Sequence, residues 1–233
     1  MKRNQSGFTL IEIAIVLVII GLLLGGVLKG QELINSAKVK NLAADFKNVP
    51  LFIYGYQDKF KALPGDDTQV ATHVTGGTAA VTPAGTLGNG LINGNWDSNV
   101  FSDESIVFWQ HVRLAGLAAG PTVVPTSNIT SDQDPYLPQN SVGGRIGVES
   151  GSSIPPIVGM KGSYFICSQH ILGKFAKQLD TTLDDGVSNT GSLMITADAA
   201  SSATSPRAAS PAAIVPAAGI PADDVLYTVC MGV

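Results

Sequence analysis

The side chains that most often carry out catalysis are sparse and scattered in this sequence. His73, His111 and His170 lie far apart along the chain, and the sequence contains neither a His-Glu-x-x-His motif nor a Gly-x-Ser-x-Gly motif. Three isolated histidines are more typical of packing and surface positions than of a catalytic site. We therefore expect no enzymatic activity.

Pairs of adjacent carboxylates are the next candidates, because Ca²⁺ is a hard cation that prefers oxygen ligands. None of the pairs fits an EF-hand loop, and aspartates beside glycine usually form turns. We retain Asp184 and Asp185 as a candidate calcium site and expect no other cofactor. The three pairs are Asp66 with Asp67, Asp184 with Asp185, and Asp223 with Asp224.

Composition limits the class of protein that must position these residues. The chain has 233 residues, of which 45% are hydrophobic and 14% are charged, with 14 Lys and Arg against 18 Asp and Glu. This excludes a coiled-coil rod and a highly charged disordered chain. The cations are scattered and form no basic stripe, so we expect no nucleic-acid partner.

The apolar residues concentrate near the N-terminus. From Phe8 to Leu28 only Thr9 and Glu12 are polar, and as a helix this run would span roughly 32 Å, about the thickness of a hydrocarbon core. Lys2 and Arg3 precede the run, so the positive-inside rule predicts a single-pass protein with its N-terminus in the cytoplasm. No small-residue cleavage site follows Leu28, which argues against an ordinary secretory signal.

Glu12 is the most informative residue of this segment. A carboxylate inside a bilayer costs about 2.5 to 3.5 kcal/mol on insertion scales, so it usually has a partner. One interpretation pairs it with another group during assembly. The alternative is that Glu12 reaches the membrane interface and interacts only with the positive end of its own helix.

The membrane segment also contains two pairs of glycines that are four residues apart, Gly21 with Gly25 and Gly26 with Gly30. This spacing allows close packing of helices in lipid.

The segment Ser6-Gly7-Phe8-Thr9-Leu10-Ile11-Glu12, after a basic leader and before a membrane-length helix, resembles the N-terminus of type IV pilins and type II secretion pseudopilins. The resemblance implies a leader at residues 1–7, cleavage by a prepilin peptidase between Gly7 and Phe8, and N-methylation of Phe8. It also implies that Glu12 meets the N-terminal amine of a neighbouring subunit.

That resemblance predicts a structural subunit of a type IV pilus or type II secretion pseudopilus. Its partners would be other pilin or pseudopilin subunits in a homo- or hetero-polymer, a membrane platform protein and an ATPase. The subunit would reside in the inner membrane with its head outside the cytoplasm, and then in the filament. Many pilins have a proline near the position of Lys29, whereas this chain has none before Pro50. The rival hypothesis is a membrane-anchored extracytoplasmic binding protein or enzyme that does not polymerise.

Beyond the membrane segment at residues 8–28, spacings of three and four predict that an amphipathic stem helix occupies residues 29–63. Pro50 interrupts this stem and is expected to kink it. An aromatic stripe at Phe52, Tyr54, Tyr56 and Phe60 is expected in the core. The expected apolar face consists of Val39, Leu42, Phe46, Val49, Ile53, Tyr56 and Phe60.

Residues 64–233 are expected to form an extracytoplasmic head of the α+β class, rich in loops and containing a small antiparallel sheet. Helices are predicted at 102–118 and 168–182. Strands are predicted around 145–148, 163–167, 193–197 and 225–230. Several short segments of this head, among them Ala62-Leu63-Pro64-Gly65-Asp66, also resemble a recurring set of bacterial pilin-like proteins.

Cys167 and Cys230 lack the spacing of a zinc site, and outside the cytoplasm thiols oxidise, so we predict a disulfide between them. Similarity to pilins implies the same, since many have a C-terminal disulfide loop. Within this loop, residues 199–221 are rich in Ala, Ser and Pro. They are interpreted as an exposed excursion that serves either as a receptor-binding tip or as a linker.

Overall fold

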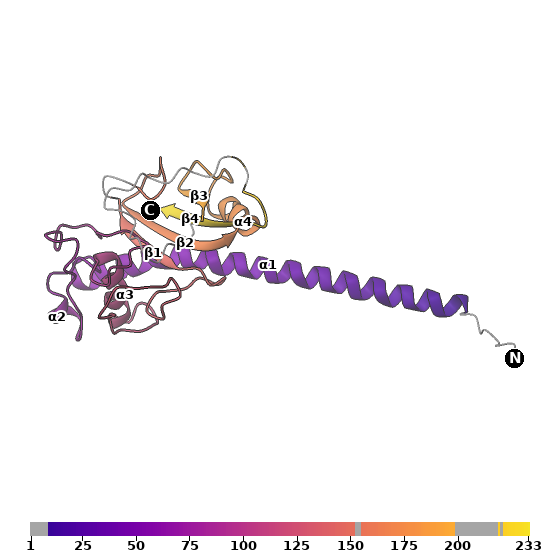
Figure 1. Ribbon diagram of the computed structural model, residues 1–233, viewed down its shortest axis with the longest axis horizontal. Coiled ribbons are helices and arrows are strands. Elements are labelled where there is room, and N and C mark those ends of the chain that lie inside the picture. The colour runs from indigo at the N-terminus through magenta and orange to yellow at the C-terminus, as the bar shows by residue number, and fades with distance from the viewer. Residues whose placement is uncertain (1–8, 152–154, 199–218, 220) are drawn as a thin grey trace. The chain divides into compact units, whose positions relative to one another are not determined.

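The computed structural model describes residues 9–151, 155–198, 219 and 221–233. The chain divides into two units, Met1–Lys38 and Val39–Val233. Figure 1 labels the elements of the described residues. In chain order they are α1 (Leu10–Phe60), α2 (Val70–His73), α3 (Glu104–Leu114), β1 (Ile146–Ser150), β2 (Tyr164–Leu172), α4 (Gly173–Leu183), β3 (Leu193–Ala197) and β4 (Leu226–Gly232).

The first unit contains the apolar part of α1. Its side chains are exposed on every face of the helix, from Leu10 to Leu28, and the most apolar window of α1 has no buried residue. Among the described residues, α1 is the one helix long and apolar enough to cross a membrane. A helix that is apolar all round needs lipid or other protein around it.

The second unit uses the remainder of α1 as part of its core. Six of the seven predicted apolar-face residues are buried and Phe60 is partly buried, which confirms the predicted face. Tyr54 is 52% exposed, so the prediction that the whole aromatic stripe lies in the core was wrong for this residue. The helix continues through Pro50 and ends at Phe60, earlier than the predicted boundary at residue 63, because Lys61 adopts a left-handed conformation with φ 56°.

A four-stranded antiparallel sheet forms the other side of this core, in the order β1-β2-β4-β3 (Figure 1). The predicted strands and the α+β class are confirmed. The helix predicted from Ser168 was wrong at its start: β2 continues to Leu172, and α4 begins at Gly173. Pairing with β4 explains this, since β2 remains hydrogen-bonded to β4 beyond a bulge between Ser168 and Ile171.

Helix α3 is shorter at both ends than the predicted 102–118. Asp103 has an extended backbone and forms the N-cap position, and its carboxylate accepts a hydrogen bond from Ser98 Oγ instead of capping α3. At the other end Gly116, with φ 78°, turns the chain away. Short helix α2 was not predicted. Helices α1, α3 and α4 contribute with the sheet to one hydrophobic core.

Candidate assembly site and buried polar groups

Helix α1 begins with a reciprocal capping arrangement between Thr9 and Glu12. Glu12 Oε2 accepts hydrogen bonds from Thr9 N and Thr9 Oγ1, both at 2.7 Å, and Glu12 N donates to Thr9 Oγ1 at 3.3 Å. Sequence reasoning missed this capping box, although the Thr-x-x-Glu spacing at a helix start is its signature. Within one chain, the carboxylate thus has a local partner.

The groups with which Glu12 is predicted to pair lie outside the described residues. Gly7 and Phe8, the predicted cleavage and methylation sites, belong to the segment 1–8 that the structure does not describe. Pairing of Glu12 with the amine of Phe8 therefore stays a prediction.

The glycines of the membrane segment face open space in the single chain. A Cβ built on Gly21, Gly25, Gly26 or Gly30 would meet no heavy atom within 4 Å, apart from the immediate chain neighbours and the backbone of its own helix turn. Packing within the described chain therefore does not require glycine at these positions. That these glycines allow close contact with helices of other subunits stays a prediction.

Cys167 and Cys230 form a disulfide with an S–S distance of 2.08 Å, as predicted. The two residues are directly opposite each other on β2 and β4, in the middle of the sheet. Trp96, Ile157 and Met194 are among the buried residues packed around them. The disulfide thus joins the C-terminal strand to the core of the head.

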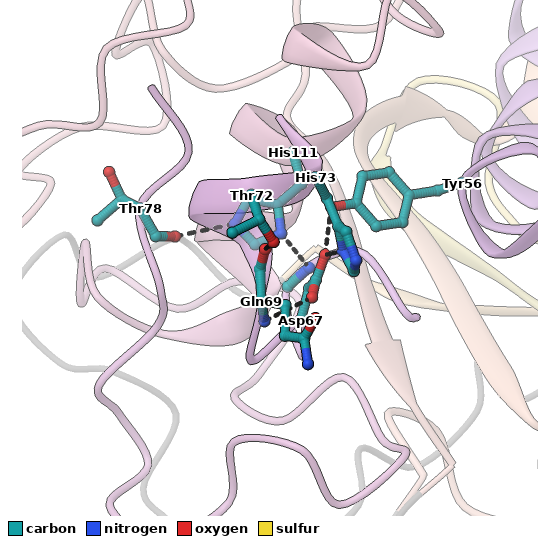
Figure 2. Close-up of polar contacts among 8 residues, drawn as sticks. Tyr56, Asp67, Gln69, Thr72, His73, Thr78 and His111 are labelled. Carbon is teal, nitrogen blue, oxygen red and sulfur yellow. Dashed lines mark hydrogen bonds and ion pairs between the residues drawn. The ribbon is translucent and has the colours of Figure 1, made fainter. Parts of the chain in front are cut away.

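A second group of polar residues lies where α1, α2 and α3 meet, as Figure 2 shows. Tyr56 points from α1 toward Asp67, and its hydroxyl donates to Asp67 Oδ2 at 2.7 Å; His73 Nδ1 lies 2.6 Å from the same oxygen. Gln69 N donates to Asp67 Oδ1 at 2.8 Å. Burial by itself would raise the pKa of Asp67, but hydrogen bonds from His73, Tyr56 and Gln69 outweigh burial and hold the pKa below its ordinary value.

His111 fixes the turn after α1 to helix α3. Gly65 N donates to His111 Nδ1 at 2.9 Å, so Nε2 is the protonated nitrogen and donates to Thr78 O at 2.8 Å (Figure 2). The side chain is completely buried, and burial lowers the pKa of His111 despite the opposing contributions of Thr78 O and Asp67. His111 is therefore a neutral packing histidine, in agreement with the expectation from the sequence.

This network does not form a catalytic triad. His73 has its carboxylate partner, but within residues 9–151, 155–198, 219 and 221–233 no serine, threonine or cysteine side chain hydrogen-bonds to its ring. Asp66, next to Asp67, accepts from the backbone N–H groups of Gly88, Asn89 and Gly90. Both carboxylates thus organise loops of the head, as expected for aspartates in a turn.

The predicted calcium ligands Asp184 and Asp185 lie beside a third carboxylate that the sequence analysis did not include. One oxygen each of Asp180, Asp184 and Asp185 lies within 4.8 Å of the others. Burial raises the pKa of Asp180 to about 6, with further contributions from the charges of Asp185 and Asp184 and against a hydrogen bond from Gly186 N. Asp180 lies in the last turn of α4, and Asp184 follows the end of that helix, so closeness in sequence could have suggested it.

The remaining candidate residues have ordinary contacts. His170 Nε2 lies 3.4 Å from a carboxylate oxygen of Asp198, and Asp223 pairs with Lys177. Most of the Ala/Ser/Pro-rich segment 199–221 lies outside the described residues, so its predicted exposure and role stay predictions.

Residues 2–28 match the family model of the prokaryotic N-terminal methylation motif, which is the pilin and pseudopilin signature. The match contains the predicted cleavage site, Glu12 and the membrane segment. It supports a type IV pilin-like prepilin, and it suggests a structural subunit more than an enzyme. No curated protein and no solved structure matches this chain significantly.

Proposed function

We propose that this chain is a pilin-like structural subunit of a type IV pilus or a type II secretion pseudopilus. A prepilin peptidase removes residues 1–7, Phe8 is N-methylated, and the mature subunit polymerises through its N-terminal helix. The carrying observation is the methylation motif at residues 2–28, which includes the apolar, membrane-length start of α1 with Glu12 in its first turn.

On assembly, the apolar part of α1 leaves the lipid and packs against other subunits. In the bilayer, lipid chains surround the apolar part of α1, and in a filament the same surface contacts neighbouring subunits. Packing and buried polar contacts, rather than hydrophobicity, then decide whether the helices associate. An amine released at Phe8 would supply the positive charge that compensates Glu12 of a neighbouring subunit.

The head faces the extracytoplasmic side in this proposal, which agrees with the disulfide between Cys167 and Cys230. A platform protein and an ATPase drive extraction from the inner membrane. The mature chain would carry 12 cations against 18 anions, a net charge of −6 after loss of Lys2 and Arg3. Such a subunit is not expected to bind nucleic acid unaided.

Mass spectrometry of the native N-terminus, combined with a Glu12→Ala variant, tests this proposal. The expected mature species begins at Phe8 and carries one added methyl group, and Glu12→Ala should abolish or sharply reduce incorporation into filaments. Glu32→Ala is the matched control, because Glu32 is an exposed carboxylate of the same helix that pairs locally with Lys29. An unprocessed chain in cells with an active peptidase would instead favour a membrane-anchored binding protein or enzyme. Normal incorporation of Glu12→Ala would contradict the proposed role of Glu12 in assembly.

A further inference from the structure

Asp45 differs from the other carboxylates in the stem part of α1. Glu32 is 2.7 Å from Lys29, and Asp58 is 3.2 Å from Lys61, each a pair of residues three positions apart. Asp45 makes no hydrogen bond or ion pair with any described residue. Its own helix offers no cation three or four positions away, since those positions hold Asn41, Leu42, Asn48 and Val49.

The surroundings of Asp45 make this lack of a partner costly. The half-buried carboxylate lines a cavity of about 150 Å³ together with Phe52, Trp109 and Ile146. Burial alone raises the pKa of Asp45 to about 6. The cavity has the volume of roughly five water molecules, enough for the end of a long side chain.

A buried cation on the same cavity directs its hydrogen bonds to other groups. Arg113 of α3 lines the same cavity, but its Nη1 donates to the carbonyl oxygens of Pro121 and Tyr136 at 3.0 and 2.8 Å. Its guanidinium also lies over the rings of Trp109 and Tyr136. Among the described residues Arg113 forms no hydrogen bond or ion pair with Asp45, so it is not the partner of this carboxylate.

Two lysines of α1 are cations that lack a partner among the described residues. Lys40 and Lys47 are exposed, and neither contacts a polar group or an aromatic ring among the described residues. They are seven positions apart and so lie on one face of the helix, about 140° to 160° around it from Asp45. A single subunit therefore presents an unpaired carboxylate on one side of α1 and unpaired ammonium groups on nearly the opposite side.

We propose that Asp45 of one copy binds the Lys40–Lys47 face of a second copy of this chain, with the lysine end entering the cavity beside Trp109. Complementary surfaces on different sides of one subunit make a heterologous contact, and such a contact extends into an open filament when its rotation does not close a ring. This inference rests on the proposed function and names a contact between successive subunits.

Zero-length cross-linking of wild-type filaments tests the contact, because a carbodiimide joins a carboxylate to an amine only where the two groups touch. An amide bond between Asp45 of one subunit and Lys40 or Lys47 of the next should give a ladder of dimers, trimers and larger species, and peptide mass spectrometry should identify the linked residues. Lys161, which is exposed on the head, should not be linked to Asp45.

Charge variants test the same contact independently. Asp45→Asn should lower filament yield about tenfold or more, while the detergent-solubilised subunit melts no earlier than wild type, because a neutral amide needs no counter-charge. Asp45→Lys should block assembly, and adding Lys40→Asp with Lys47→Asp should restore it.

The outcomes separate this inference from the proposed function. Wild-type filaments in which Asp45 is not cross-linked to Lys40 or Lys47 overturn the contact and leave the pilin-like function standing. Normal filaments from Asp45→Asn do the same, and they would fit a free cation in the cavity. If Asp45→Asn lowers the melting temperature of the solubilised subunit, Asp45 has a role inside the head. That result also overturns the contact. Absence of wild-type filaments with an uncleaved leader overturns the proposed function itself.

Discussion

At the scale of single residues, Asp67 is the clearest test of how the head holds its loops. Its carboxylate receives hydrogen bonds from Tyr56 and the backbone of Gln69 and contacts His73, while its own side chain is 99% buried. Because its pKa is lower in the folded than in the unfolded chain, the stability that it contributes is present above its ordinary pKa of 3.8. That contribution is lost as the pH falls below this value.

Asp67→Asn should therefore destabilise the head by about 2 to 4 kcal/mol at pH 7, since it removes a charged acceptor that buried donors require. Urea unfolding at several pH values measures this, and the difference from wild type should shrink toward pH 3. Asp223→Asn, at an exposed carboxylate, is the control and should change stability by less than about 1 kcal/mol. A difference that is independent of pH would contradict the assignment of Asp67.

The second prediction at this scale is that Asp184 and Asp185 bind calcium, with Asp180 as a third ligand. Three carboxylates whose oxygens lie within 4.8 Å repel one another, and a divalent cation would relieve the repulsion. Because the pKa of Asp180 is about 6, protons compete with the metal, so affinity should rise between pH 5 and pH 7.5. Isothermal titration with Ca²⁺ should show this dependence, and Asp185→Asn should weaken it; equal affinities at both pH values would contradict the proposed set.

At the scale of secondary-structure elements, a helix or strand could be predicted where its signal lies within its own residues. Strand β3 has the predicted bounds 193–197, and the buried face of α1 follows its apolar spacing. The polar run Ser168-Gln169-His170 gave no strand signal. Ser168 is paired with both neighbouring strands, β1 and β4, and the next two residues lie at the bulge between paired segments of β2. For the candidate site, Gly7, Phe8 and Glu12 were identified from a contiguous motif. His111 and Gly65 are 46 positions apart, so only the fold could reveal that contact.

The disulfide makes a prediction about β2 and β4. It closes a loop with a sequence separation of 63, which in the chain-entropy model stabilises the head by about 4 kcal/mol. The double variant Cys167→Ser with Cys230→Ser should lose roughly this amount in urea unfolding, and a reducing agent should affect wild type but not the variant. Equal stability of the two oxidised proteins would show that pairing of the strands alone holds the C-terminal segment.

At the scale of the whole molecule, the two units should differ in what they need in order to be stable. The apolar part of α1 has no buried residues, whereas the part from Val39 onward supplies seven buried side chains to the second unit. The second unit should therefore fold without the membrane segment, and it should not polymerise. Removal of the start of its own core helix should prevent folding.

Two truncations separate these expectations. A chain beginning at Asn35 keeps every buried α1 residue of the second unit and should be a monomeric protein with cooperative thermal unfolding. A chain beginning at Pro50 loses Val39, Leu42, Ala43, Phe46 and Val49, and burial of large apolar side chains contributes about 1.5 to 3 kcal/mol each. The four large side chains among them account for about 6 to 12 kcal/mol. This is comparable with the whole stability of a domain, about 5 to 15 kcal/mol, so the shorter chain should not fold. Circular dichroism and light scattering provide the measurements, and cooperative unfolding of the chain from Pro50 would show that α1 is dispensable to the head.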